Sequence, residues 1–346
     1  MEYRGRYSVF DAGRIRTYPL AGRANKVKLA SLVWPDSVLG NRDDLIASTR
    51  RKIRDVAGKI LEARRKDRAV ICFTGAHLIK NGMGPLLADL VERGLITLVG
   101  GNGATGIHDF ELAEIGETSE NVPNALPKGR FGMAYEFAFI NAALKVGNDC
   151  KLGYGESLGR TMLDAAFRRK VAAACVPRMP RKTRLEFRHP EASVLARCYK
   201  CNVPMTILAG IGTDVLDQHA SFDGEAKGGT SGRDFLIYAR EARRLSGGVV
   251  LNIGSAVTGP EVLLKALSMS SNVGQPAKGI TTADFDLRPD AKHQRTESDF
   301  GYYFRDQKSV VLRIPEAFGG KGFYIQGNHT QTVPALYCAL RELTKD

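Results

Sequence analysis

Residues 69–111 read AVICFTGAHLIKNGMGPLLADLVERGLITLVGGNGATGIHDFE, and this stretch decides the fold. Two short runs rich in β-branched and apolar residues, at 69–74 and 95–100, flank a helical pattern near 84–93. Strand, helix and strand in this order predict a βαβ unit, in which both strands lie parallel in one sheet.

The same alternation continues along the chain. Further strands are expected at 205–210, 249–253, 279–285 and 310–314, and helices at 41–67, 233–245, 260–270 and after Pro334. The middle, 129–200, is expected to be mostly helical, with an exposed excursion at PRMPRKTR, 177–184. The pattern predicts an α/β fold: a Rossmann-like parallel sheet with helices on both faces and extra helices at the N-terminus and in the middle. No long linker divides the chain, so one domain, 1–346, with an N-terminal extension, 1–40, is expected.

Composition excludes several classes of protein. With 346 residues, 43% of them hydrophobic, the chain can bury a large core. No stretch approaches the roughly 18 uninterrupted apolar residues of a membrane span. The start, MEYRGRYSVF, lacks the apolar core of a signal peptide. We therefore expect no membrane association and a cytoplasmic protein.

Charge and cysteines give weaker signals. The net charge is +13, but the arginines of 50–54 and 64–66 fall on the polar face of the expected 41–67 helix. No nucleic-acid-reading motif accompanies them, so no nucleic-acid partner is expected. Cys198 and Cys201 form a C-x-x-C without a second ligand pair, so no metal site is expected either.

Parallel sheets bind ligands in the loops that follow the carboxyl ends of their strands. In the loop after 95–100, Gly101, Gly103 and Gly106 fit G-x-G-x-x-G, which lets backbone approach a pyrophosphate. The match is partial, because the dinucleotide-binding pattern also requires a second strand that ends in an acidic residue. At that position ETSENVP, 117–123, is predicted to be a loop. An ordinary tight turn between strand and helix is the alternative.

Two later loops, 210–219 and 281–286, carry carboxylates that can hold a cationic amine. Asp214, Asp217 and Asp286 are the candidates for binding a charged substrate, and His219 is the candidate proton acceptor. Each acid taken alone is also consistent with a helix cap or a solvated loop. His108 is consistent with either a structural or a functional histidine.

The segments FTGAHLIKNGMGPLLADLVERGL, NGATGIHDFELAEIGE, IGTD, GSAVTGPEVLLKAL and TTADFD, taken together, resemble bacterial deoxyhypusine synthase-like proteins from about residue 41 to the end. The resemblance implies NAD as cofactor, a polyamine substrate and a homotetramer. It also implies a set of cofactor-binding residues: Ala76, His77, Asn102, Gly103, Ala104, Thr105, Gly106, Asp109, Thr282, Ala283 and Asn328.

The resemblance further implies a lysine that forms an imine with the substrate. Lys308, which precedes the expected strand at 310–314, is the candidate catalytic nucleophile, and Lys321 is the second choice. The chain departs from the authentic enzymes in two ways. GSAVTGPE, 254–261, lacks their histidine, and the only tryptophan, Trp34, is far from either lysine.

Three functions remain open from the sequence. The first is an NAD-dependent transferase that moves an aminobutyl group from spermidine or putrescine to an amine acceptor. The second is deoxyhypusine synthesis on a lysine of translation initiation factor 5A, which the two departures disfavour. The third is a non-catalytic oligomer that binds NAD or a polyamine.

Overall fold

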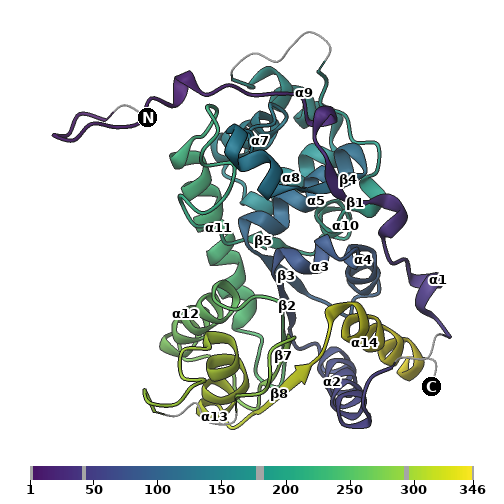
Figure 1. Ribbon diagram of the computed structural model, residues 1–346. Helices are drawn as coiled ribbons and strands as arrows, with labels where there is room; N and C mark the ends of the chain where they lie inside the picture. Colours follow the sequence, from purple (N-terminus) through teal and green to yellow (C-terminus); the bar gives the residue numbers. More distant parts are fainter. Residues whose placement is uncertain (1–2, 41–43, 177–182, 292–295, 345–346) are drawn as a thin grey trace.

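The computed structural model describes residues 3–40, 44–176, 183–291 and 296–344 (Figure 1). Eight strands lie in these ranges: β1 Asn25–Lys28, β2 Val70–Thr74, β3 Leu98–Gly101, β4 Glu117–Glu120, β5 Met205–Ile207, β6 Val249–Ile253, β7 Thr281–Asp286 and β8 Lys321–Gln326. The α-helices are α1 Pro35–Val38, α2 Ala47–Arg65, α3 Ala76–Lys80, α4 Gly84–Glu92, α5 Gly103–Ile115, α6 Val122–Ala125, α7 Phe137–Asp149, α8 Tyr154–Leu163, α9 Ala165–Ala173, α10 Val194–Lys200, α11 Gly224–Ala242, α12 Thr258–Asn272, α13 Ile314–Ala317 and α14 His329–Leu343. A π-helical segment, η6, spans Gln307–Arg313.

Six strands form one sheet in the order β5-β3-β2-β6-β7-β8, and every neighbouring pair is parallel. The chain starts in the centre at β2, builds outward through β3 to β5, and then returns to β6 on the other side of β2. This order is that of doubly wound dinucleotide-binding sheets, with the change of direction between β2 and β6. The predicted fold class is confirmed.

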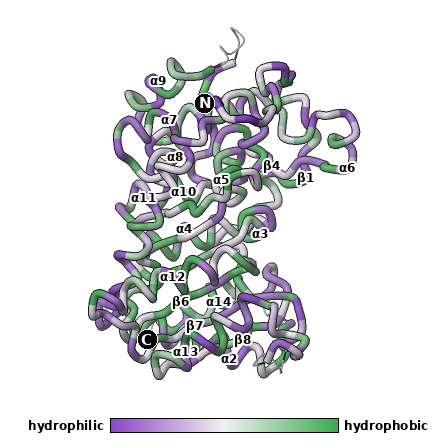
Figure 2. The backbone as a smooth tube through the Cα atoms, turned by 90° about the vertical axis from the view of Figure 1, so that its left-hand side faces the viewer, coloured by the Kyte–Doolittle hydropathy of each residue, from purple (hydrophilic) through white to green (hydrophobic). Residues whose placement is uncertain are grey.

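Alternation of side chains along the strands builds a core on each face. Val70 and Cys72 of β2 pack with α2, α4, α5 and α14, whereas Ile71 and Phe73 pack with α11 and α12. All five residues of β2 and of β6 are buried, as expected for central parallel strands covered on both faces. In Figure 2, β6 lies in the lower half of the molecule, between α12 and β7.

The N-terminal segment lies along the outside of the helical region (Figure 1). Tyr18 forms a β-bridge with Ala134, and β1 pairs antiparallel with β4 in a separate two-stranded sheet. The segment 117–120, which the sequence predicted as a loop, is therefore a strand, because β1 supplies its partner. This pairing brings the segment around β1 next to α5, where Arg23 pairs with Glu111.

The largest error in the predicted elements lies near the C-terminus. The run at 310–314, predicted as a strand, belongs to η6 and α13, and the last strand is β8. Periodicity does not separate a short buried strand from a short buried helical turn, and here Val310 and Ile314 are both buried. Most of the predicted excursion at 177–184 lies outside the described residues.

Candidate functional site

The carboxyl ends of β2 and β6 define the centre of the candidate site. Gly75 follows β2 and Gly254 follows β6, and their backbones lie so close that a Cβ on Gly75 would be 2.1 Å from the carbonyl oxygen of Gly254. At such a change of direction the two flanking connections leave on opposite faces of the sheet, which opens a crevice for a ligand. Three exposed apolar side chains stand in the loops at this edge: Ile211 after β5, Val257 after β6 and Leu287 after β7.

Three histidines and a lysine converge on this edge. His77 and Lys80 belong to α3, His108 to α5 and His329 to α14. Partial burial lowers the pKa of His77, and so do the positive charges of Lys80, His329 and His108. His77 therefore has a greater tendency to be neutral than a free histidine, although the ring is exposed to solvent.

His329 was missed from the sequence, which pointed instead to the preceding residue. The side chain of Asn328 caps α14 by accepting a hydrogen bond from the amide of Thr330. The ring of His329 lies against Gly254, where a Cβ would be 2.7 Å from Cε1, and Nε2 donates to the carbonyl of Phe285 at 3.0 Å. This bond leaves Nδ1 as an acceptor, and within the described part of the chain it has no hydrogen-bond partner.

A hydrogen-bonded chain orients His108. The hydroxyl of Thr118 donates its single proton to Oε2 of Glu111, so its oxygen accepts from Nδ1–H of His108 at 2.7 Å. Arg23 pairs with the other oxygen of Glu111 at 2.7 Å. Burial acts to raise the pKa of Glu111, but His108 and Arg23 outweigh it and lower that pKa. The chain Glu111–Thr118–His108 therefore leaves Nε2 of His108 free to accept a proton.

His108 lines a cavity of about 270 Å³ between α3, α5, β4 and the loop after β5. Lys80 and Ala104 also line it, so the cavity adjoins the edge of the sheet where β2 and β3 end. Of the predicted cofactor residues, Ala104 alone lines this cavity; Ala76 begins α3, and His77 follows it.

The loop with the G-x-G-x-x-G pattern is used for internal packing. Asn102 caps α5 by accepting bonds from the amide and hydroxyl of Thr105. A Cβ on Gly103 would be 2.0 Å from Oδ2 of Asp214, so that carboxylate covers the first residue of the helix. Gly106 makes ordinary contacts with Ile207. The sequence predicted that the Gly103 backbone is open to a cofactor. The side chain of Asp214 covers it instead.

Asp214 and Asp217 are already neutralised within the chain. Nζ of Lys227, whose side chain is only 1% exposed, bonds Oδ2 of Asp214 at 2.8 Å, Oδ1 of Asp217, and the carbonyl of Gly210 at 2.9 Å. Burial raises the pKa of Asp214, and the bond from Lys227 opposes this shift. The two carboxylates therefore bind an internal amine, whereas the sequence assigned them to a substrate amine.

The strand β7 contributes less to the site than expected. Asp286 is bound by its neighbour Arg288, with Nη2–Oδ2 at 2.8 Å, and Arg288 also bridges to Asp306. Thr282 and Ala283 are buried in the first half of β7, before its carboxyl end, and the hydroxyl of Thr282 donates to the carbonyl of Val310.

Asp109 and His219 lie in the core, away from this edge. Asp109 caps α10, accepting bonds from the amides of Val194 and Leu195 and from the hydroxyl of Ser193; burial raises its pKa to about 6. Nδ1 of His219 contacts the hydroxyl of Ser221 at 2.7 Å, and burial lowers the pKa of His219 to about 4. Neither side chain lines the cavity beside His108.

Lys308 does not precede a strand, because it belongs to η6. It is buried, with Nζ 3.5 Å from the centre of the Tyr302 ring, and among the described residues it has no ion-pair partner. Burial and the charges of Arg313 and Arg305 lower its pKa. Lys321, the second candidate, is exposed at the start of β8.

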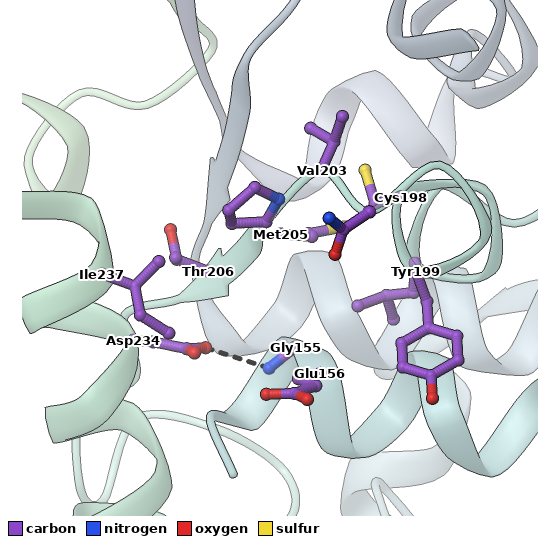
Figure 3. A pocket seen from close by; sticks show the side chains of 12 residues that line it. Gly155, Glu156, Cys198, Tyr199, Val203, Met205, Thr206, Asp234 and Ile237 are labelled. Carbon is purple, nitrogen blue, oxygen red and sulfur yellow. Dashed lines mark hydrogen bonds between the residues drawn. The ribbon is translucent and has the colours of Figure 1, made fainter. Parts of the chain in front are cut away.

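A cavity of about 490 Å³ is a different site (Figure 3). It lies beside edge strand β5, between α8, α10 and α11. Its buried carboxylate, Asp234, is held by the amides of Gly155 at 2.9 Å and Ile207 at 2.7 Å. Burial raises the pKa of the Cys198 thiol in its wall, which makes that thiol unreactive. The carboxylate of Asp234 and the thiol of Cys198 in this cavity thus have structural roles.

Two further features bear on function. No group of three or more His, Cys, Asp or Glu side chains within the described ranges is arranged to hold a metal ion, and Cys198 and Cys201 are free thiols. No helix in the same ranges combines the length and hydropathy needed to cross a membrane.

Comparisons with known proteins give structural neighbours only. No protein-family model and no curated protein sequence matches the chain. AgrE, solved as a ternary complex with ornithine and NAD⁺, matches with a TM-score of 0.50 and 13% identity over 88% of this chain and 34% of that chain. ArgZ, a cyanobacterial arginine dihydrolase, has a TM-score of 0.49 at 16% identity, over 88% of this chain and 33% of its own. A LOR/SDH protein from Methanococcus maripaludis has a TM-score of 0.47 at 15% identity, over 90% of this chain and 74% of its own.

These neighbours correct the interpretation of the sequence. The chain spans about a third of the length of AgrE and ArgZ, and at these identities the likeness shows the fold alone. The identification as a deoxyhypusine synthase-like protein is wrong, because the fold is matched by AgrE, a protein solved with ornithine and NAD⁺. The aminobutyl transferase, the modification of factor 5A and the non-catalytic polyamine-binding oligomer lose their support with it. The tetramer stays a prediction.

Proposed function

We propose that the protein is an NAD-dependent enzyme that moves a hydride between the cofactor and an amine-bearing carbon of a small polar substrate. One observation carries this proposal. The sheet changes direction between β2 and β6, and at that edge a cavity of about 270 Å³ contains an imidazole oriented by a carboxylate. The presence of ornithine and NAD⁺ in AgrE, which shares the fold, supports the choice of cofactor and of an amine-bearing substrate.

The residues of the crevice fit a dinucleotide. The helix α12 starts shortly after β6. The Ser255 hydroxyl accepts from the amide of Gly259 at 2.9 Å and Pro260 has no amide hydrogen, so among the first three residues of the helix the amide of Thr258 is the one available to a phosphate. Val257 and Leu287, 58% and 63% exposed, offer apolar surface to a planar ring. Nδ1 of His329 adds a hydrogen-bond acceptor between these two loops.

The chain's own residues supply proton transfer and orientation. Oxidation of an amine-bearing carbon removes a hydride from carbon and a proton from nitrogen, and leaves an imine; bound NAD⁺ supplies the hydride acceptor. Nε2 of His108 accepts the proton. Glu111, through Thr118, stabilises the imidazolium that forms, and the apolar walls of the cavity exclude water from it.

The cofactor site is tested by calorimetry with NAD⁺. The variant Ala256→Glu places a carboxylate on the exposed loop between β6 and α12, beside the proposed phosphate position. Its affinity for NAD⁺ should be at least tenfold lower than that of the unmodified protein. Ala165→Glu places the same charge on the exposed first residue of α9 and should bind NAD⁺ like the unmodified protein. Equal affinities in folded Ala256→Glu and the unmodified protein would reject this site.

Turnover is tested with NAD⁺ and L-ornithine, L-arginine or L-lysine. We expect either NADH absorbance or, where the hydride returns to the product, a new product mass without net NADH. Bound NAD⁺ without any chemical change in these amino acids or in simple amines would reject the enzymatic role.

A further inference from the structure

The charged groups around the cavity beside His108 are unevenly paired. Five charged side chains other than His108 line it: Arg23, Lys80, Glu111, Glu120 and Asp214. Arg23 and Glu111 form an ion pair at 2.7 Å, and Asp214 is held by Lys227. Lys80 and Glu120 remain, and within the described ranges neither has an ion-pair partner of opposite charge.

Lys80 is a cation that no described residue neutralises. It stands at the end of α3 and is partly buried, and among the described residues it has neither a hydrogen bond nor an ion pair. Its charge also opposes protonation of His77, so the local field at this end of the cavity is positive. A ligand carboxylate would remove this imbalance.

Glu120 is a carboxylate whose hydrogen-bond donors, among the residues that the structure describes, are neutral. Oε1 accepts from the hydroxyl of Tyr18 at 2.8 Å, and Oε2 accepts from the amide of Gly132 at 3.0 Å. Burial and then the Glu120 carboxylate raise the pKa of Tyr18, as expected beside an anion. Each oxygen has a further lone pair, so Glu120 is able to accept from an ammonium.

The backbone beside Glu120 is strained. Ser119 lines the cavity and is buried. Its φ of 72° lies in the left-handed region, which residues other than glycine rarely adopt. Strained residues of this kind gather at binding sites.

The walls between the two charges are apolar. Ile107, Val122, Phe131, Phe137 and Val215 line the same cavity. Its volume of about 270 Å³ is below the ~300–1,000 Å³ of pockets for drug-sized molecules, so the cavity fits a small metabolite.

We propose that this cavity binds a small amino acid at both of its charged ends, with Lys80 on the carboxylate and Glu120 on an ammonium group. The apolar walls hold the carbon chain between them. The proposal names the substrate class of the enzyme proposed above and rests on it for the reaction, although binding is measured independently of turnover.

Calorimetry with three probes separates the two ends. L-Ornithine carries both groups, putrescine lacks the carboxylate, and pentanoate lacks the ammonium. Without NAD⁺, so that no turnover occurs, the protein should bind L-ornithine at least tenfold more tightly than either other probe. Lys80→Met should weaken L-ornithine and pentanoate at least tenfold and leave putrescine unchanged. Glu120→Gln should weaken L-ornithine and putrescine and leave pentanoate unchanged.

Two matched variants control for non-specific charge effects. Lys26→Met removes an exposed lysine on β1, and Glu117→Gln removes a carboxylate on β4 that pairs with Lys28 and does not line the cavity. Both should bind all three probes like the unmodified protein.

The outcomes distinguish the two proposals. Normal NAD⁺ binding with no binding of L-ornithine, L-arginine or L-lysine would overturn the amino-acid site and leave the cofactor site standing. The amino-acid site is also overturned if either variant weakens putrescine and pentanoate equally. Failure of NAD⁺ to bind would overturn the proposed function, while the pattern of probe affinities without NAD⁺ still decides the amino-acid site.

Discussion

The carboxylate of Asp214 lies directly over the Cα of Gly103, where a Cβ would be only 2.0 Å from Oδ2. The glycine at the start of α5 is therefore needed for contact between two parts of the same chain. Asp214 is held in this place by Lys227, so the contact joins the loop after β3 to α11.

Gly103→Ala should destabilise the protein by about 2 kcal/mol or more, because the new methyl group displaces Asp214 from its buried partner. Gly106→Ala is the matched control on the same helix. There the nearest atoms are 3.6 Å from the added Cβ, and loss of a helical glycine adds ~0.5–1 kcal/mol of stability. Urea unfolding of both variants checks the difference. Equal stability of the two would show that Asp214 is not fixed against Gly103.

Lys227→Met should cost about 3–5 kcal/mol, because it leaves Asp214 and Asp217 buried with no cation. Lys145→Met is the control, since Lys145 is exposed and its contact with Asp223 is long, at 3.8 Å. Thermal or urea unfolding measures both. A stable Lys227→Met protein would mean that the two carboxylates are exposed to solvent.

Asp234 should make stability fall as pH rises from about 4 to about 7. Burial raises its pKa in the folded protein to about 7 from 3.8, so in this window the folded state binds a proton that the unfolded state has released. The contribution of Asp234 to stability is complete below its pKa in the unfolded protein. It is lost as the pH rises through its pKa in the folded protein.

The measurement compares the unmodified protein with Asp234→Asn, which does not titrate at this position. Relative to the variant, the unmodified protein should lose on the order of 2–4 kcal/mol of unfolding free energy between pH 4 and pH 7. The comparison removes the opposing contributions of His77 and His219, whose pKa values are lowered. Parallel pH curves for the two proteins would contradict the raised pKa.

The fold was predictable because its signal is local and repeated. Five of the six strands of the parallel sheet overlap the predicted runs, since β-branched residues fill both faces of buried strands such as β6. β8 escaped prediction because KGFYIQ, 321–326, is polar at both ends, whereas the more apolar 310–314 is helical. A short run of apolar residues such as 310–314 is consistent with a buried strand and equally with a buried helical turn.

The site was predictable only as a region. The family resemblance named His77 and Ala104, whereas the search of loops at carboxyl ends assigned Asp214 and Asp217 to a substrate because Lys227 is ten or more positions away along the chain. Thr118 was placed in a loop, so its bond to His108 was not foreseen. Lys80 and Glu120 attracted no attention because a missing partner is a property of three-dimensional packing. No pattern in one sequence reports it.

The last prediction concerns the hydroxyl of Thr118. Thr118→Val keeps the shape of the side chain but removes the hydroxyl that bridges His108 and Glu111 and leaves their direct Nδ1–Oε2 distance of 3.7 Å, so the neutral imidazole loses the hydrogen bond that fixes its tautomer. In a turnover assay with the amino acid that the protein accepts, kcat should fall about 10- to 100-fold while the affinity for NAD⁺ stays unchanged. Thr118→Ser is the matched control, because it restores the hydroxyl at the cost of a methyl group, and it should recover most of the rate. A purely structural role would make both variants lose stability without this difference in kcat. Equal kcat values for Thr118→Val and Thr118→Ser would therefore remove His108 as the oriented proton acceptor.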